Sequence, residues 1–260
     1  MDIDAIIEKV KQQVAIELGK SESSGATAYD PHIKTCFTEI NKTEVPSHIE
    51  HSLLNPDISK EKIVEECFLA KKYGFANVCV SPYYVSLAAE ILRGSSVAVC
   101  APVGFPHGAA STAAKLCEIR ECMKNGATEL DIALNILAIK SGEIADARAD
   151  LEQMVATAAG KAKVKAIYEQ SLYTEEEKKI VLGLILSTGS DYVKISNALS
   201  GKPAKEEDVL FVRTIVGRNV GIKIDGGIKS LQRAIEVLQS GADRIGLSAS
   251  VSVAKEAYAK

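Results

Sequence analysis

The sequence predicts a (β/α)8 barrel of the TIM type, preceded by an N-terminal extension. From about residue 48, eight short strand-like runs alternate with longer segments of helical periodicity. This alternation is typical of parallel strands joined by helices, and eight such units suffice to close a barrel. The main alternative is a doubly wound open sheet, which the absence of a Gly-rich dinucleotide turn after the first run disfavours.

The expected elements follow one another in a regular order. We expect strands at 50–55, 77–82, 97–103, 129–136, 164–170, 191–197, 220–225 and 243–248. Helices are expected at 59–73, 82–93, 112–125, 144–160, 174–188, 204–217 and 230–240. Glycines suited to helix C-caps stand at positions 74, 94, 126 and 241. Thr174 with Glu177 three residues later predicts a capping box.

Two regions are expected along the chain. Residues 1–45 form an N-terminal helix and linker extension, and residues 46–260 form the barrel domain. The first 20 residues combine an amphipathic helical pattern with scattered charges, which is unlike a signal peptide. The polar stretch SESSGATAYDPHIKT after them is typical of a linker.

The composition is that of an ordinary soluble globular protein, with 47% hydrophobic and 25% charged residues among 260. A net charge of −3 offers no electrostatic basis for binding nucleic acid or an anionic membrane. The longest apolar run is shorter than the ~18 residues of a membrane span. Six cysteines without a C-x-x-C pair predict reduced thiols and a cytoplasmic location. The sequence leaves the oligomeric state open, including a homo-oligomer.

Lysines lie in the middle of two apolar strands, in SDYVKISN (Lys194) and VGIKIDGG (Lys223). Because side chains alternate faces along a strand, parity separates inward from outward positions. Parity directs Asp131, Lys165, Lys194 and Lys223 into the barrel, near the strand ends that carry active sites in this fold. Parity also directs Cys79 and Ser196 inward. Together with Lys165, these two residues are candidates for binding the substrate. A buried salt-bridge network is the structural alternative, but charges gathered in a cleft more often indicate function.

A lysine attacks a carbonyl only when it is unprotonated, and at an ordinary pKa of ~10.4 only about one in 2500 is neutral at pH 7. Burial and a second ammonium group both lower the pKa of a lysine. The positive charge of one lysine of the pair could therefore favour the neutral form of the other. The second lysine could then form a Schiff base. An inward carboxylate such as Asp131 could then move protons through a water molecule.

Metal chemistry is disfavoured, because three of the four histidines lie in the first fifth of the chain and no metal-binding motif is present. A phosphate site is expected where Gly226 and Gly227 follow the seventh strand and Ser248 follows the eighth.

Several motifs together resemble one family, deoxyribose-phosphate aldolase. They are YGFANVCVSPYYV, VGFPHGAASTAAKLCE, NGATELDIALNI, IKSGEI, DYVKIS, GIKIDGGIKS and GADRIGLSAS, and the resemblance covers residues 48–250. It implies a lyase, a class I Schiff-base aldolase of deoxyribonucleotide catabolism on a (β/α)8 barrel. Such an enzyme cleaves the phosphorylated sugar 2-deoxyribose 5-phosphate into acetaldehyde and glyceraldehyde 3-phosphate, without metal or cofactor.

The resemblance also implies roles for three residues. Lys194 would form the Schiff base, Lys223 would lower its pKa, and Asp131 would relay protons. The sequence departs from the family pattern at Ala198 and Ala249, which replace a glycine and a serine, and at Asp225, which replaces an alanine or serine. We expect Asp225 to lie beside Lys223, to offset its field on Lys194 and to give slow turnover with an alkaline optimum. Two alternatives stay open: another class I aldolase with a different aldehyde substrate, or a low-activity barrel serving as a binding or scaffold protein.

Overall fold

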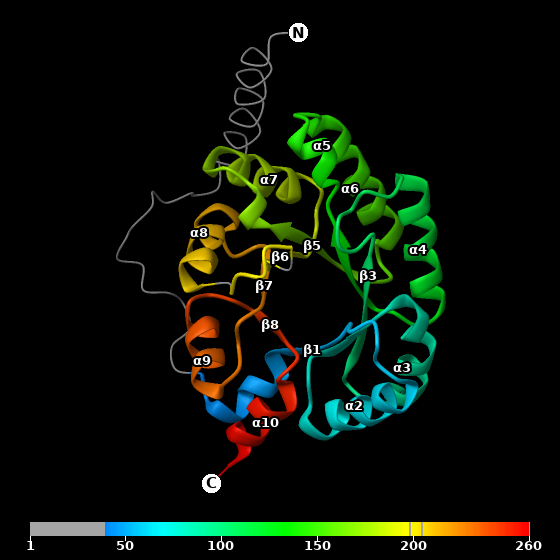
Figure 1. The fold of residues 1–260 in the computed structure, drawn as a ribbon, viewed down its shortest axis with the longest axis vertical. Helices are drawn as coiled ribbons and strands as arrows, with labels where there is room; N and C mark the ends of the chain where they lie inside the picture. Colours follow the sequence, from blue (N-terminus) through cyan, green and yellow to red (C-terminus); the bar gives the residue numbers. More distant parts are fainter. Residues whose placement is uncertain (1–39, 198, 204, 260) are drawn as a thin grey trace.

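The eight expected strands are present and form a closed parallel barrel in chain order. The computed structural model describes residues 40–259 except 198 and 204. The strands are β1 (Ile49–Leu53), β2 (Asn77–Val80), β3 (Ala98–Val103), β4 (Glu129–Ala133), β5 (Lys163–Glu169), β6 (Tyr192–Ser196), β7 (Gly221–Asp225) and β8 (Arg244–Leu247). Figure 1 shows the helices arranged around these strands. The predicted barrel is therefore confirmed.

Helices connect successive strands on the outside of the barrel. They are α2 (Lys60–Tyr73), α3 (Val85–Leu92), α4 (Thr112–Lys124), α5 (Ile136–Lys140), α6 (Ile144–Ala158), α7 (Glu175–Ser187), α8 (Glu206–Val216), α9 (Leu231–Gln239) and α10 (Ser250–Tyr258). Short 3-10 turns η1 (Lys42–His48), η2 (Pro82–Tyr84) and η3 (Gln170–Leu172) complete the described elements. The seven expected helices are confirmed, whereas α5 and α10 were not predicted from the sequence.

Local signals account for several helix boundaries. Thr174 caps α7 and forms the expected capping box with Glu177. Gly74 ends α2 in the left-handed conformation, with φ of 67°, which glycine adopts without strain. At the other three expected caps, the glycine follows the C-cap residue and also has positive φ.

The apolar core lies between the barrel and its helices. Leu130 and Ile132 on β4 are fully buried on this outer face, as are Val193 and Ile195 on β6. The alternate positions of the same strands point inward and carry charge, as parity predicts. Within the described residues, none of the helices is long and apolar enough to cross a membrane.

The division into an extension and a barrel stays a prediction. Residues 1–39, which include the expected N-terminal helix and most of the linker, lie outside the described part of the chain. The described chain enters the barrel through η1, and Nζ of Lys42 donates to the carbonyl oxygen of Ala259 at 2.8 Å.

Candidate active site

The strand register brings the predicted catalytic residues to neighbouring positions inside the barrel. Lys194 on β6 is paired with Lys223 on β7, and Asp131 on β4 is paired with Lys165 on β5. All four side chains are nearly or completely buried. Their inward orientation confirms the assignment from parity.

Asp131 is the centre of this cluster, because its carboxylate contacts all three lysines. Its Oδ2 lies 2.8 Å from Nζ of Lys194 and 2.7 Å from Nζ of Lys223. Its Oδ1 lies 3.1 Å from Nζ of Lys165. A proton on Lys194 or Lys223 therefore has a direct hydrogen-bonded path to this carboxylate.

Two further carboxylates complete the buried part of the cluster. Glu50 on β1 places Oε2 2.6 Å from Nζ of Lys223 and 3.3 Å from Nζ of Lys165. Glu129 places Oε2 2.6 Å from Nζ of Lys165 and also accepts a 2.6 Å hydrogen bond from Asn77. Glu50 and Glu129 have the inward parity of this cluster, but they were not among the predicted site residues.

Asp225 lies closer to Lys194 than the sequence indicated. Its Oδ2 is 2.7 Å from Nζ of Lys194, and its Oδ1 is 3.7 Å from Nζ of Lys223. The expected inward orientation is present, but the shorter contact is with the predicted nucleophile itself. Backbone parity fixes the face of a strand and leaves open which of two neighbouring ammonium groups a carboxylate reaches.

These contacts determine the direction of the carboxylate pKa shifts. Burial acts to raise the pKa of Asp131, but the three surrounding ammonium groups outweigh it and hold the pKa well below its usual value. For Glu50 too, burial is opposed by Lys165 and Lys223, and the net pKa is lowered. Both carboxylates are therefore ionised at neutral pH.

The lysine shifts run opposite to the simplest expectation for a Schiff-base lysine. Burial and Lys223 both act to lower the pKa of Lys194, but Asp131 and Asp225 outweigh them and raise it above its ordinary value. The pKa values of Lys165 and Lys223 are also raised, since nearby carboxylates overcome burial. All three lysines are thus held as ammonium ions at neutral pH.

Two buried thiols lie beside this cluster. Cys79 on β2 is paired in register with Cys100 on β3, and Sγ of Cys100 donates to Oδ1 of Asp131 at 3.2 Å. Burial, followed by the contact with Cys79, raises the pKa of the Cys100 thiol well above its usual value. Cys100 was not predicted as a site residue, because strand three was not assigned by parity.

The donor atoms near these thiols suit ammonium groups better than a metal ion. Cys79, Cys100 and Asp131 bring their ligand atoms within 4.8 Å of one another, as do Glu50, Cys100 and Glu129. However, Nζ of Lys165 already lies 2.6 Å from Glu129, 3.1 Å from Asp131 and 3.4 Å from Cys100. A cation at either position would have to displace this ammonium group, so the residues present do not fit a metal centre.

The remaining predicted residues lie at the C-terminal ends of the strands or in the loops that follow them. Ser196 on β6 donates to the buried carboxylate of Glu169, which also accepts from the backbone N–H of Leu199 at 3.4 Å. Glu169 thereby anchors the β6–α8 loop directly after Lys194. Ala198 of that loop lies outside the described residues.

Gly226 and Gly227 follow β7 and are exposed, with φ of 102° and 80°. A methyl group at Gly227 would overlap the ring of Pro203, so the β6–α8 loop packs against this turn. Ser248 is exposed after β8 and lines a groove of about 450 Å³ with Ser52 and Asn55. These residues lie at the C-terminal ends of strands, where barrel enzymes bind their substrates.

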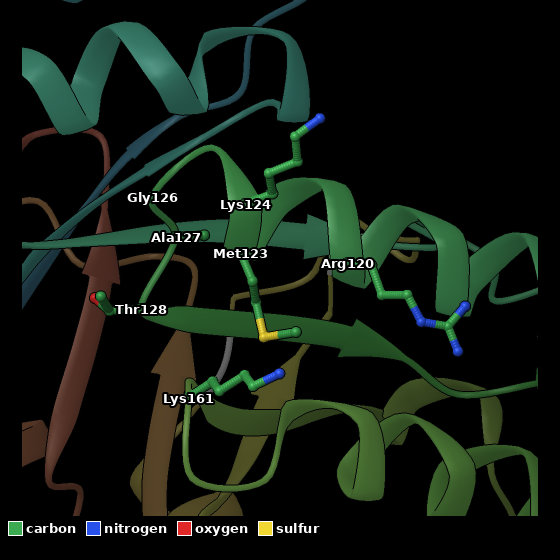
Figure 2. Close-up of a pocket in the computed structure, with 7 residues that line it drawn as sticks. All are labelled: Arg120, Met123, Lys124, Gly126, Ala127, Thr128 and Lys161. Carbon is green, nitrogen blue, oxygen red and sulfur yellow. The ribbon is translucent and has the colours of Figure 1, made fainter.

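A second groove, of about 440 Å³, lies at the opposite end of the barrel. Figure 2 shows the residues that line it, including Arg120 and Lys124 on α4 and Lys161 in the loop before β5. Thr128, which directly precedes β4, places this groove at the N-terminal ends of the strands. It therefore lies at the other end of the barrel from the turns that contain Gly226, Gly227 and Ser248.

Comparisons with known proteins agree with this geometry. The model of the DeoC/LacD family of aldolases matches residues 42–252. A deoxyribose-phosphate aldolase from Geobacillus sp. (strain WCH70) is 43% identical over 212 residues, which are 82% of this chain and 95% of that protein. The Bacillus subtilis deoxyribose-phosphate aldolase is 42% identical over 207 residues, covering 80% of this chain and 93% of its own.

Solved structures have the same fold. The aldolase QR15 superposes with a TM-score of 0.78 and 32% identity, covering 82% of this chain and 95% of its own. A tetrameric deoxyribose phosphate aldolase from Aeropyrum pernix superposes with a TM-score of 0.76 and 27% identity, covering 83% of this chain and 91% of its own. The family match and the curated relatives each span most of the barrel described above, and this chain belongs to the DeoC/LacD family of aldolases.

Proposed function

We propose that this protein is a class I aldolase that reversibly cleaves 2-deoxyribose 5-phosphate into acetaldehyde and glyceraldehyde 3-phosphate. The observation that carries the proposal is Lys194, whose Nζ is held 2.8 Å from Asp131 beside a second buried lysine at the end of the barrel where active sites form. The curated relatives named above are deoxyribose-phosphate aldolases and cover the same part of the chain.

The first stage is formation of the covalent adduct. Lys194 loses a proton and attacks the aldehyde carbon of the open-chain sugar, giving a carbinolamine. Loss of water then gives an iminium ion, which withdraws electrons from the neighbouring carbon–carbon bond. Asp131 accepts a hydrogen bond from Nζ of Lys194, so it is placed to exchange protons with this nitrogen directly or through a water molecule.

The second stage breaks the bond between the second and third carbons of the sugar. The electron pair moves toward the iminium nitrogen and forms an enamine, while the hydroxyl on the third carbon loses its proton and becomes the aldehyde of glyceraldehyde 3-phosphate. Protonation of the enamine carbon restores an iminium ion. Water then hydrolyses it, releasing acetaldehyde and the free lysine.

The experiment is chemical trapping of the adduct. The protein is incubated with acetaldehyde, reduced with borohydride, digested and analysed by mass spectrometry. We expect an ethyl group on the peptide carrying Lys194 and its loss in Lys194→Arg, because a guanidinium group stays protonated. Lys161→Arg, which changes an exposed lysine in the groove at the N-terminal end of the barrel, is the matched control. A label on Lys165 or Lys223 in place of Lys194 would contradict the assignment.

A second candidate is a class I aldolase that acts on an unphosphorylated aldehyde. The observation that favours it is Asp225, whose carboxylate directly precedes the exposed Gly226–Gly227 turn expected to bind phosphate. A carboxylate there opposes the approach of a phosphate dianion. Comparing kcat/KM for 2-deoxyribose 5-phosphate and 2-deoxyribose distinguishes the two functions.

The remaining site residues have supporting roles in the proposal. Gly226, Gly227, Ser196 and Ser248 would bind the phosphorylated end of the sugar, and Cys79 and Lys165 would line the interior beside the reacting carbons. The partner is a small phosphorylated sugar, with no cofactor, no nucleic acid and no membrane. A cytoplasmic location and assembly into a homo-oligomer are further parts of this proposal.

A further inference from the structure

The carboxylate of Asp225 lies on the accessible side of the predicted nucleophile. Nζ of Lys194 is held between two carboxylates, with Asp131 at 2.8 Å and Asp225 at 2.7 Å. The Asp131 side chain is fully buried, whereas that of Asp225 is 23% exposed. An incoming aldehyde therefore reaches the amine from the side on which Asp225 lies.

The barrel has a place for this carboxylate. Asp225 is paired in register with Gly246 on β8. A methyl group at Gly246 would overlap Oδ1 of Asp225. The absence of a side chain at Gly246 thus leaves the room in which the Asp225 carboxylate lies against Lys194.

The charge balance of the described cluster depends on Asp225. The titratable side chains that face the interior around Lys194 are Glu50 on β1, Cys79 on β2, Cys100 on β3, Asp131 and Glu129 on β4, Lys165 and Glu169 on β5, and Lys223 and Asp225 on β7. Between these side chains and Lys194 itself, the ion pairs join three lysines to four carboxylates. Without Asp225, Lys194 would keep only Asp131, which it shares with both other lysines.

We propose that Asp225 is a positioning residue that holds the Lys194 ammonium in a resting ion pair, so that formation of the covalent adduct is slow until this pair is broken. The inference rests on the proposed role of Lys194 as the Schiff-base lysine. It assigns to Asp225 the control of how fast the adduct forms. The pKa of Lys194 agrees with it, because burial acts to lower this pKa but Asp131 and then Asp225 outweigh burial and raise it.

The charge on the nitrogen before, during and after the reaction determines whether Asp225 affects the rate or the equilibrium extent of adduct formation. An ammonium ion and an aldehyde give an iminium ion and water, so the nitrogen is cationic before and after the step. Asp225 stabilises both cations, but it does not stabilise the neutral amine that attacks between them. Its carboxylate therefore lowers the rate of adduct formation while leaving the equilibrium extent nearly unchanged.

The test measures the rate and the extent of adduct formation separately. Protein is mixed with acetaldehyde, quenched with borohydride after increasing times and analysed for ethylated Lys194, from about pH 6 to about pH 10, below the ordinary lysine pKa of ~10.4. Wild type is compared with Asp225→Asn, which keeps the shape of the side chain, and with Asp225→Ser, which shortens it. Asp146→Asn, which neutralises an exposed carboxylate on the outer helix α6, is the control.

We expect both Asp225 variants to form the adduct at least about tenfold faster than wild type at neutral pH, since each unit of pKa changes the neutral fraction tenfold. The difference in rate between wild type and the Asp225 variants should shrink as the pH rises. The final extent of adduct formation should be the same in all three proteins. Asp146→Asn should follow wild type. Superimposable rate profiles for wild type and both Asp225 variants would overturn the inference and leave the proposed function intact. Absence of any Lys194 adduct in all of these proteins would overturn the proposed function, and this inference with it.

Discussion

Replacing Asp131 by asparagine tests whether this carboxylate serves the reaction or only the fold. The substitution keeps the shape of the side chain and removes the charge that contacts Lys165, Lys194 and Lys223 at 2.7–3.1 Å. We expect turnover to fall by about 100-fold or more, the usual scale when a group that transfers protons is lost. The fold should survive the same change.

The expected stability cost follows from the ion pairs that remain. Breaking a buried pair costs about 3–5 kcal/mol when it leaves a charge uncompensated. In Asp131→Asn each lysine keeps a carboxylate, because Lys165 retains Glu129, Lys194 retains Asp225 and Lys223 retains Glu50. We therefore expect a cost of about 3 kcal/mol or less, which a domain with ~5–15 kcal/mol of stability tolerates.

The assay combines urea unfolding followed by circular dichroism with a coupled measurement of glyceraldehyde 3-phosphate release. Glu129→Gln is the matched control, since it also removes a buried carboxylate but one that contacts Lys165 and Asn77. We expect the two variants to lose similar stability, and Asp131→Asn to lose far more turnover. Unfolding of Asp131→Asn at room temperature, or turnover equal to that of Glu129→Gln, would refute the catalytic role.

Two further predictions concern pH and the β6–α8 loop. The pKa values of Asp131 and Glu50 are lowered on folding, so their contribution to stability is present above the unfolded values of ~3.9 and ~4.3 and is lost as the pH falls below them. The raised pKa of Lys194 acts at the other end, where its contribution is present below ~10.4 and is lost as the pH rises through the folded value. Urea unfolding should therefore show a decline below about pH 4 and above about pH 10, and a flat profile would contradict the ion-pair network. Separately, Glu169→Gln leaves one acceptor oxygen for Ser196 and Leu199, so it should raise KM for the phosphorylated sugar by about tenfold while acetaldehyde trapping on Lys194 stays unchanged. Equal losses in both measurements would show that Glu169 supports the whole barrel rather than this loop.

The parts of the structure that the sequence predicted are those set by local periodicity. Alternation with a period of two identified the inward face of β4 and β6, and it placed Asp131 and Lys194 correctly before any contact was known. Helix α7 was equally well defined, because its capping box is written in adjacent residues. Helix α5 was missed because it spans only Ile136–Lys140, directly after a strand that was predicted to run three residues longer.

The ion pairs across the barrel could not be predicted in the same way. Glu50 on β1 reaches Lys165 on β5 and Lys223 on β7, and neither strand is a neighbour of β1 in the sheet. Such contacts depend on barrel closure and on the rotamers of long side chains. Neither follows from the spacing of residues along one strand.

Asp225 shows how this limit affects the functional interpretation. Parity placed it inward beside Lys223, two residues earlier on the same strand, and from that position it would act on Lys194 only by offsetting the field of Lys223. The structure instead pairs it with Lys194 on the adjacent strand, at 2.7 Å rather than the 3.7 Å that separates it from Lys223. A direct counter-ion acts on the nucleophile more strongly than a screened neighbour, because Coulomb energy rises as distance falls and as water is excluded. From the sequence, Asp225 was expected to have only a modest, indirect effect on Lys194. Its direct contact with Lys194 makes it a candidate for controlling the rate of the first chemical step.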